Sequence, residues 1–174
     1  KSLKERSDAH KPFAEAVKKK DSDKAREEAG SKWIDVRCFG QVFAFKGDDA
    51  SIGIRGPVSL HPAFSIAPIL VTSTQITKSV NSVTGSKKSS DTMGMKHRVD
   101  FGLYVAYGSI NCQLAEKTGF SEEDAELIKE TLRTLFENDA SSARSDGRME
   151  VCKLYWLHHN CKSCQYSSEK VQRS

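Results

Sequence analysis

The stretch Asp91-Thr92-Met93-Gly94-Met95-Lys96-His97-Arg98-Val99-Asp100-Phe101-Gly102-Leu103-Tyr104-Val105-Ala106-Tyr107-Gly108 is the most informative part of this chain for its fold. By the two-residue period of a strand, one face of its second half would carry Val99, Phe101, Leu103, Val105 and Tyr107. The opposite face would carry only Asp100, Gly102, Ala106 and Gly108. The stretch therefore predicts a basic loop that leads into a strand with one face open to close approach.

A second strand precedes this loop and makes the two a hairpin. Residues Ile69 to Val80 are rich in Val, Thr and Ile, which favour strands. Between them and Val99, residues Asn81 to Arg98 are polar, basic and contain Gly and Ser. We expect a long hairpin with a protruding tip.

Further elements are expected on the N-terminal side. Residues 1–30 predict two short helices separated near Pro12, with Gly30 as the C-cap signal of the second. Trp33 to Phe45 predicts a strong strand, in which Gly40 marks a bulge or a close backbone approach. Ser51 to Val58 predicts an edge strand.

On the C-terminal side, Ser121 to Asn138 predicts a helix. Ser121 is a good N-cap and Asp124 occupies the reciprocal position of a capping box. Met149 to Leu157 predicts a last strand. Together the elements predict an α+β fold with helices on one face of a sheet, which is most of a ferredoxin-like or RRM-like domain.

The formal net charge of +4 is unevenly distributed. Residues 112–140 carry three Lys or Arg against eight Asp or Glu, whereas residues 32–111 carry nine against five. The basic remainder suits a polyanion or an ordinary solvated surface. No apolar run approaches the ~20 residues that cross a bilayer, so we expect a soluble protein with no membrane partner. The five cysteines, an odd number, suit a reducing cytoplasm better than a disulfide framework.

The strongest candidate site is the basic hairpin. Its cations and the side chains between them are Lys78, Lys87, Lys88, Met93, Gly94, Met95, Lys96, His97 and Arg98. Lys and Arg can neutralise phosphates, and an apolar Met can wedge between bases. The alternative is an exposed hairpin with solubilising lysines.

Two other constellations carry weaker signals. The segment His158 to Cys164 contains Cys-x-x-Cys beside two His, which suggests zinc, but only Cys152 offers a further nearby thiol and free tail thiols are the alternative. We therefore assign no metal and no cofactor. Asp91, His97 and Asp100 could supply acid–base chemistry for RNA cleavage or form an ordinary charged hairpin.

Several motifs together resemble a known family, and they run in family order from about Trp33 to His158. They are Asp35-Val36-Arg37-Cys38-Phe39-Gly40, Gly53-Ile54-Arg55-Gly56-Pro57-Val58, Ser59-Leu60-His61-Pro62, Thr92-Met93-Gly94-Met95-Lys96-His97, Phe101-Gly102-Leu103-Tyr104, the segment Leu114 to Asp124, and Ala140-Ser141-Ser142-Ala143-Arg144. The chain resembles the backbone subunit of the CRISPR antiviral Cascade complex, most closely of type I-C, within the RAMP superfamily.

The resemblance implies a modified RRM-like palm over residues 32–160, with a hairpin thumb at about 76–98, a helical accessory segment over 1–31 and a polar tail over 161–174. Copies of the family stack along one CRISPR RNA and present it for pairing with target DNA, beside other Cascade subunits. Met93 and Met95 would be wedges, and Lys96, His97 and Arg98 would contact phosphates. Arg37 and Arg55 become candidate backbone contacts on the palm.

Two departures from the family pattern have a structural implication. The family normally begins with a strand, an Asn/Gly/Asp-rich loop and a helix, none of which precedes Lys1. Relatives also usually carry a few more residues where Gly56-Pro57-Val58 runs directly into Ser59. We expect that segments are missing from the chain, which an intact-mass measurement near 19.3 kDa would contradict.

Three functions compete. The first is a non-catalytic guide-RNA scaffold, and the second is a RAMP-type endoribonuclease that cuts CRISPR RNA through His97 or a nearby Asp. The third is an interaction module with a zinc-bound tail. Discrete RNA that co-purifies with the protein would favour the first.

Overall fold

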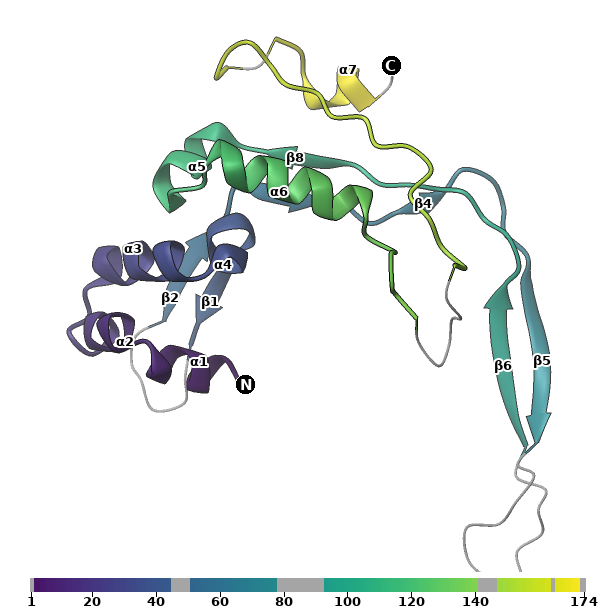
Figure 1. The fold of residues 1–174 in the computed structure, drawn as a ribbon, viewed down its shortest axis with the longest axis horizontal. Coiled ribbons are helices and arrows are strands. Elements are labelled where there is room, and N and C mark those ends of the chain that lie inside the picture. The colour runs from purple at the N-terminus through teal and green to yellow at the C-terminus, as the bar shows by residue number, and fades with distance from the viewer. Residues whose placement is uncertain (1, 45–50, 78–92, 141–146, 164, 173–174) are drawn as a thin grey trace, which may run out of the picture. The chain divides into compact units, whose positions relative to one another are not determined.

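The computed structural model describes residues 2–44, 51–77, 93–140, 147–163 and 165–172 (Figure 1). The chain divides into two compact units, one formed by Lys1–Leu60 with Gly108–Ser174 and the other by His61–Tyr107. Helices and strands both occur, so the expected α+β composition is confirmed. In the described ranges no helix is both long and apolar enough to cross a membrane.

The first unit holds all of the described helices. In chain order its elements are α1 Leu3–Ala9, α2 Lys11–Lys18, α3 Ser22–Lys32, α4 Ile34–Phe39, β1 Gly40–Phe43, β2 Ile52–Arg55, β3 Val58–Leu60, β8 Gly108–Ile110, α5 Cys112–Thr118, α6 Glu122–Arg133 and α7 Ser168–Gln172. Strand β1 pairs with β2 and β3 pairs with β8, both antiparallel.

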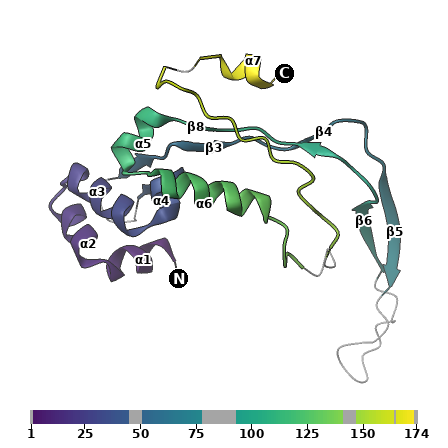
Figure 2. The same cartoon turned by 45° about the horizontal axis from the view of Figure 1, so that its top comes forward.

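The hydrophobic core belongs to the N-terminal part of this unit, where α1 to α4 cluster together (Figure 2). The ring of Phe13 lies 5.2 Å from that of Trp33 and 4.7 Å from that of Phe43, centroid to centroid. Leu3 and Val17 pack against this cluster, so the N-terminal helices are docked by apolar contacts rather than left in solvent.

Local signals explain where the helices begin. Ser121 accepts a hydrogen bond from the Asp124 amide and Asp124 accepts one from the Ser121 amide, which is the expected capping box of α6. The helix ends at Arg133, before the expected Asn138. Asn111 caps α5 in the same manner by accepting from the Leu114 amide.

The second unit consists of two antiparallel strand pairs. Strand β4 Phe64–Ser65 pairs with β7 Tyr104–Val105, and β5 Val71–Thr77 pairs with β6 Met93–Val99. The β5–β6 arm is the expected hairpin in its first strand, but its second strand is Met93–Val99, which was expected to lie in the loop (Figure 1). Residues 78–92 lie outside the described residues.

Three sequence predictions about strands are wrong. The run Trp33 to Phe45 contains helix α4 before the short β1, because α4 packs against both α3 and α5, and Val36 and Cys38 are buried. The strand expected from Val99 onward is not continuous: β6 ends at Val99, and β7 and β8 are separate short strands. Met149 to Leu157 forms no described strand.

Gly30 was expected at a helix C-terminus, and this is also wrong. It lies inside α3, which continues to Lys32, and a Cβ built on it would come within 2.7 Å of the Thr118 carbonyl oxygen in α5. Glycine here permits close helix approach. Gly40 behaves as expected: its Cβ would meet the Ile54 carbonyl oxygen at 2.2 Å, so β1 and β2 approach closely there.

The described strands pair only two by two. A continuous RRM-like sheet is not observed among the described residues, and the RRM-like arrangement stays a prediction.

Candidate functional site

The expected site residues Met93, Met95, Lys96, His97 and Arg98 all lie on strand β6 and are exposed. They were expected in a loop, but they form the second strand of the β5–β6 arm. The register pairs His97 with Ser73 and Lys96 with Thr74. The residues are therefore held by a strand ladder rather than presented by an irregular tip.

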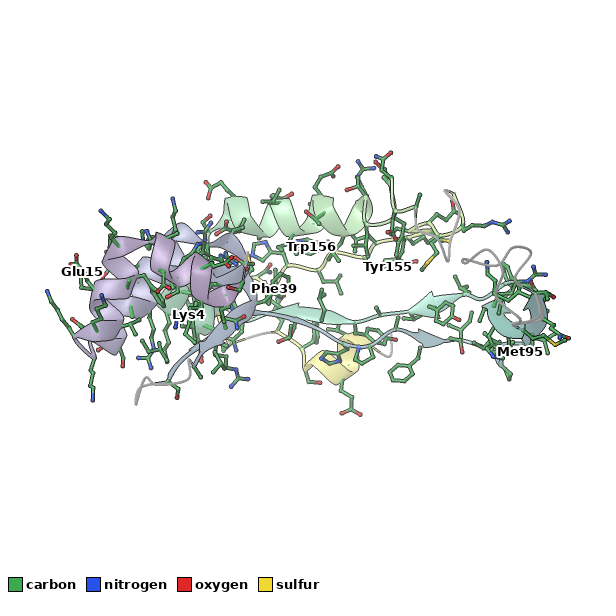
Figure 3. All side chains as sticks on the ribbon, turned by 90° about the horizontal axis from the view of Figure 1, so that it is seen from below. Lys4, Glu15, Phe39, Met95, Tyr155 and Trp156 are labelled. Carbon is green, nitrogen blue, oxygen red and sulfur yellow. The ribbon has the colours of Figure 1, made fainter. Side chains whose placement is uncertain are left out.

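The strand period divides these residues between two faces. Met93, Met95 and His97 share one face, and Lys96 and Arg98 share the other. The Met93 and Met95 side chains are 64% and 55% exposed. Figure 3 shows Met95 projecting from the arm. The side with Met93 and Met95, called the apolar face below although Gln75 Nε2 donates to the Met93 sulfur at 2.7 Å, thus lies opposite the cationic face with Lys96 and Arg98.

On the apolar face, the imidazole of His97 is bonded across the arm. Its Nδ1 lies 2.9 Å from the Ser73 hydroxyl oxygen. This hydrogen bond fixes the orientation of the ring and leaves Nε2 pointing away from the Ser73 contact.

On the cationic face, Arg98 and Asp100 form an ion pair with 2.7 Å between Nε and Oδ1. The hydroxyl of Thr72 donates to Oδ2 of the same carboxylate. These contacts, led by the Thr72 hydrogen bond, hold the pKa of Asp100 below its ordinary value. Lys96, in contrast, makes no ion pair with any residue that the structure describes.

The remaining expected contacts are placed elsewhere. Arg55 is exposed on β2, opposite Gly40. Arg37 lies on α4 with its guanidinium bonded to both carboxylate oxygens of Asp124, and its Nη1 donates to the Gly30 carbonyl. Lys78, Lys87 and Lys88 lie outside the described residues.

The described contacts give His97 no carboxylate partner for acid–base chemistry. Asp100 is bonded to Thr72 and Arg98, whereas the described partner of His97 is Ser73. Asp91 lies outside the described residues. A general acid–base pair needs two groups within reach of one phosphate, and the described contacts bring no carboxylate to His97.

The possible zinc ligands whose positions are described do not come together. Among the residues with described positions, no three His, Cys, Asp or Glu side chains form a group that could hold a metal ion. Cys164, part of the suggested Cys-x-x-Cys motif, lies outside them.

Sequence reasoning missed Ser73 and Thr72 as members of the site. Both lie on β5 and reach the site only through their cross-strand partners, His97 and Arg98. The register of the hairpin would have identified them, but the register depends on the turn, which the sequence does not define clearly.

The His61–Tyr107 unit also exposes many large apolar side chains. The most exposed are Phe101 at 85%, Leu70 at 78% and Phe64 at 70%. Exposed apolar clusters mark interaction surfaces in folded proteins. Apolar and cationic contacts are thus both available on this unit.

Comparisons with known proteins gave one family match and one structural similarity. The family model described as CRISPR-associated protein Cas7 matches residues 1–174. A solved structure titled "CRISPR RNA-guided surveillance complex, pre-nicking" contains a chain that is 18% identical, with a TM-score of 0.45 over 68% of the present chain. The present chain spans 32% of the length of that chain. A search of curated proteins gave no match.

Proposed function

We propose, from the premise that this chain belongs to the CRISPR-associated Cas7 family, that it is a non-catalytic backbone subunit that binds CRISPR RNA in a surveillance complex. The proposed complex is a cytoplasmic Cascade of type I-C. In it, several copies of the chain bind along one guide RNA beside other Cascade subunits, and the guide pairs with target DNA.

The observation that carries the proposal is the two-faced arm β5–β6. Lys96 and Arg98 on one face suit the phosphates of an RNA backbone. Met93 and Met95 on the other face suit insertion between bases that are unstacked. An RNA strand that bends around the arm would contact both faces. Two exposed methionines, in contrast, would not help a hairpin whose only role is to increase solubility.

RNA length tests the proposal. The purified chain is mixed with CRISPR RNAs of increasing length, and native mass spectrometry counts the bound copies. We expect the copy number to rise in regular steps with RNA length, and binding to weaken steeply with salt. One copy per RNA at every length would reject the backbone role.

A matched pair of variants shows whether the arm is the RNA contact. The double variant Lys96→Ala/Arg98→Ala should lose affinity and salt dependence. Its control is Lys129→Ala/Arg133→Ala, which removes the same charge from helix α6, where both cations pair with neighbouring glutamates. Equal losses of RNA affinity in the two double variants would show that binding depends on the total charge of the chain rather than on the arm.

Cleavage assays separate the scaffold from the endoribonuclease. Labelled repeat RNA is incubated with the wild-type chain and with His97→Ala, in the presence and absence of Mg²⁺. We expect intact RNA with both proteins. Cleavage by the wild type that is lost in His97→Ala would favour the enzyme.

A further inference from the structure

Three side chains form a connected group on the cationic face of the arm. Thr72 on β5 lies directly opposite Arg98 on β6, and Asp100 follows the end of β6. The carboxylate of Asp100 joins the other two: Oδ1 accepts from Arg98 Nε at 2.7 Å, and Oδ2 accepts from the Thr72 hydroxyl. Each carboxylate oxygen therefore has its own donor.

The contact with Asp100 uses only one edge of the guanidinium. Nε is engaged, and no residue within the described ranges accepts a hydrogen bond from Nη1 or Nη2 of Arg98. The Arg98 side chain remains 60% exposed. The two Nη atoms are the pair that can bind a phosphate with two parallel hydrogen bonds.

We propose that Asp100 and Thr72 are positioning residues that hold the guanidinium of Arg98 ready for one RNA phosphate; this rests on the proposed RNA-binding function. Thr72 orients the carboxylate, the carboxylate fixes Nε, and the free edge of the guanidinium faces the ligand. An Arg side chain has many rotamers, and one that is already ordered loses less conformational entropy on binding.

The same face offers an internal comparison. Lys96 lies two residues before Arg98 and therefore on the same side of the strand, but it has no anchoring carboxylate among the described residues. The arm thus combines one anchored cation with one unanchored cation. Only the anchored cation should depend on Asp100 and Thr72.

Simple electrostatics predicts the opposite effect for Asp100. Its negative charge repels a phosphate, so its removal would tighten RNA binding if charge alone mattered. If Asp100 positions Arg98, removal of its carboxylate weakens RNA binding although the arm becomes more positive. The sign of the change therefore distinguishes the two explanations.

The experiment measures the affinity of the full chain for a labelled CRISPR RNA at several salt concentrations. The variants are Arg98→Ala, Asp100→Asn and Thr72→Val, with Thr72→Ser as the variant that keeps the hydroxyl. We expect Asp100→Asn and Thr72→Val each to weaken binding roughly fivefold, and Thr72→Ser to restore most of the loss. In an Arg98→Ala background the same two substitutions should have no further effect, whereas in a Lys96→Ala background they should retain it.

The outcomes separate the two levels of the proposal. Binding by Asp100→Asn that equals or exceeds the wild type, or a loss that persists without Arg98, would overturn the positioning role alone. A wild-type chain that binds no RNA would overturn the proposed function and this inference with it. Circular dichroism and urea unfolding of each variant check that a loss of binding is not a loss of fold.

Discussion

The guanidinium of Arg37 and the carboxylate of Asp124 are joined by two parallel hydrogen bonds of 2.7 Å, although the residues lie 87 positions apart in the chain. Asp124 is also the capping residue that bonds back to the Ser121 amide at the start of α6. One carboxylate therefore completes a helix terminus and connects that helix to α4.

Loss of this pair should destabilise the protein. The Arg37 and Asp124 side chains are only 20% and 8% exposed, so Arg37→Ala leaves a carboxylate poorly solvated. We expect a loss of about 3 kcal/mol in the free energy of unfolding, measured by urea denaturation. The control is Arg133→Ala, which breaks an exposed pair with Glu130 and should cost about 0.5 kcal/mol or less. Equal costs would mean that burial of the Arg37 pair contributes nothing.

Arg37→Ala should also leave RNA binding almost unchanged. The donors of Arg37 are used by Asp124 and the Gly30 carbonyl, so few remain for a phosphate. Arg55, which is exposed and makes no described ion pair, is the contrasting variant. A drop in the salt dependence of RNA binding for Arg37→Ala, at a temperature where the variant stays folded, would show that the arginine contacts RNA.

The stabilisation from the Arg37 pair should depend on pH. The hydrogen bonds from Arg37 hold the pKa of Asp124 below its ordinary value. The pair therefore contributes fully above the pKa of the unfolded carboxyl, about 4, and loses its contribution as pH falls through the lower pKa of the folded state. The difference in unfolding free energy between wild type and Arg37→Ala should be largest at pH 6 to 7 and should shrink below about pH 4. Asp35, whose pKa is lowered by Arg6, has a similar effect on stability in both proteins, so this effect cancels when wild type and Arg37→Ala are compared.

Gly30→Ala should be destabilising despite the gain in helix propensity. Alanine in place of glycine inside a helix normally stabilises by about 1 kcal/mol. Here the new Cβ would meet the Thr118 carbonyl oxygen at 2.7 Å, and the resulting shift of α3 from α5 should cost about 2–3 kcal/mol, which exceeds the gain. Gly53→Ala is the control, since no atom lies within 4 Å of a Cβ at that position. An increase in thermal stability for Gly30→Ala would contradict the close packing.

The two faces of the arm should respond differently to salt. Lys96→Ala should lower the slope of log affinity against log salt by about 0.7 to 0.9, because one phosphate contact is lost. Met95→Ala should weaken binding several-fold with an unchanged slope, because it removes an apolar contact. Fluorescence anisotropy over a series of KCl concentrations measures both, with Met149→Ala as the control for methionine loss outside the arm. A changed slope for Met95→Ala would mean that the substitution also shifts the opposite face of the arm and its phosphate contacts.

Structural features set by residues close together in the sequence were predicted well. Ser121 and Asp124 form the capping box that their spacing indicates, because both partners lie in one helical turn. The hairpin arm was also predicted, since Val71–Thr77 is strongly β-prone.

Structural features that depend on packing were predicted poorly from the sequence. The alternation of Ile34, Val36 and Cys38 suggests a strand, but contacts with α3 and α5 select a helix in which Val36 and Cys38 are buried. Gly30 resembles a helix terminus because the approach of α5 cannot be read from neighbouring residues. Of the candidate cations, Lys96 and Arg98 lie on β6 of the arm, and their separation from Met93 and Met95 on the other face required the strand register.

The described buried apolar side chains all lie between Phe13 and Val58, and the His61–Tyr107 unit contributes none of them. Substitutions on the β5–β6 arm should therefore change the stability of the hydrophobic core very little. Over evolutionary time, such a separation would allow the arm to change its surface without loss of the core in the helical part. Lineages could adapt this surface to new binding partners without first acquiring compensating mutations.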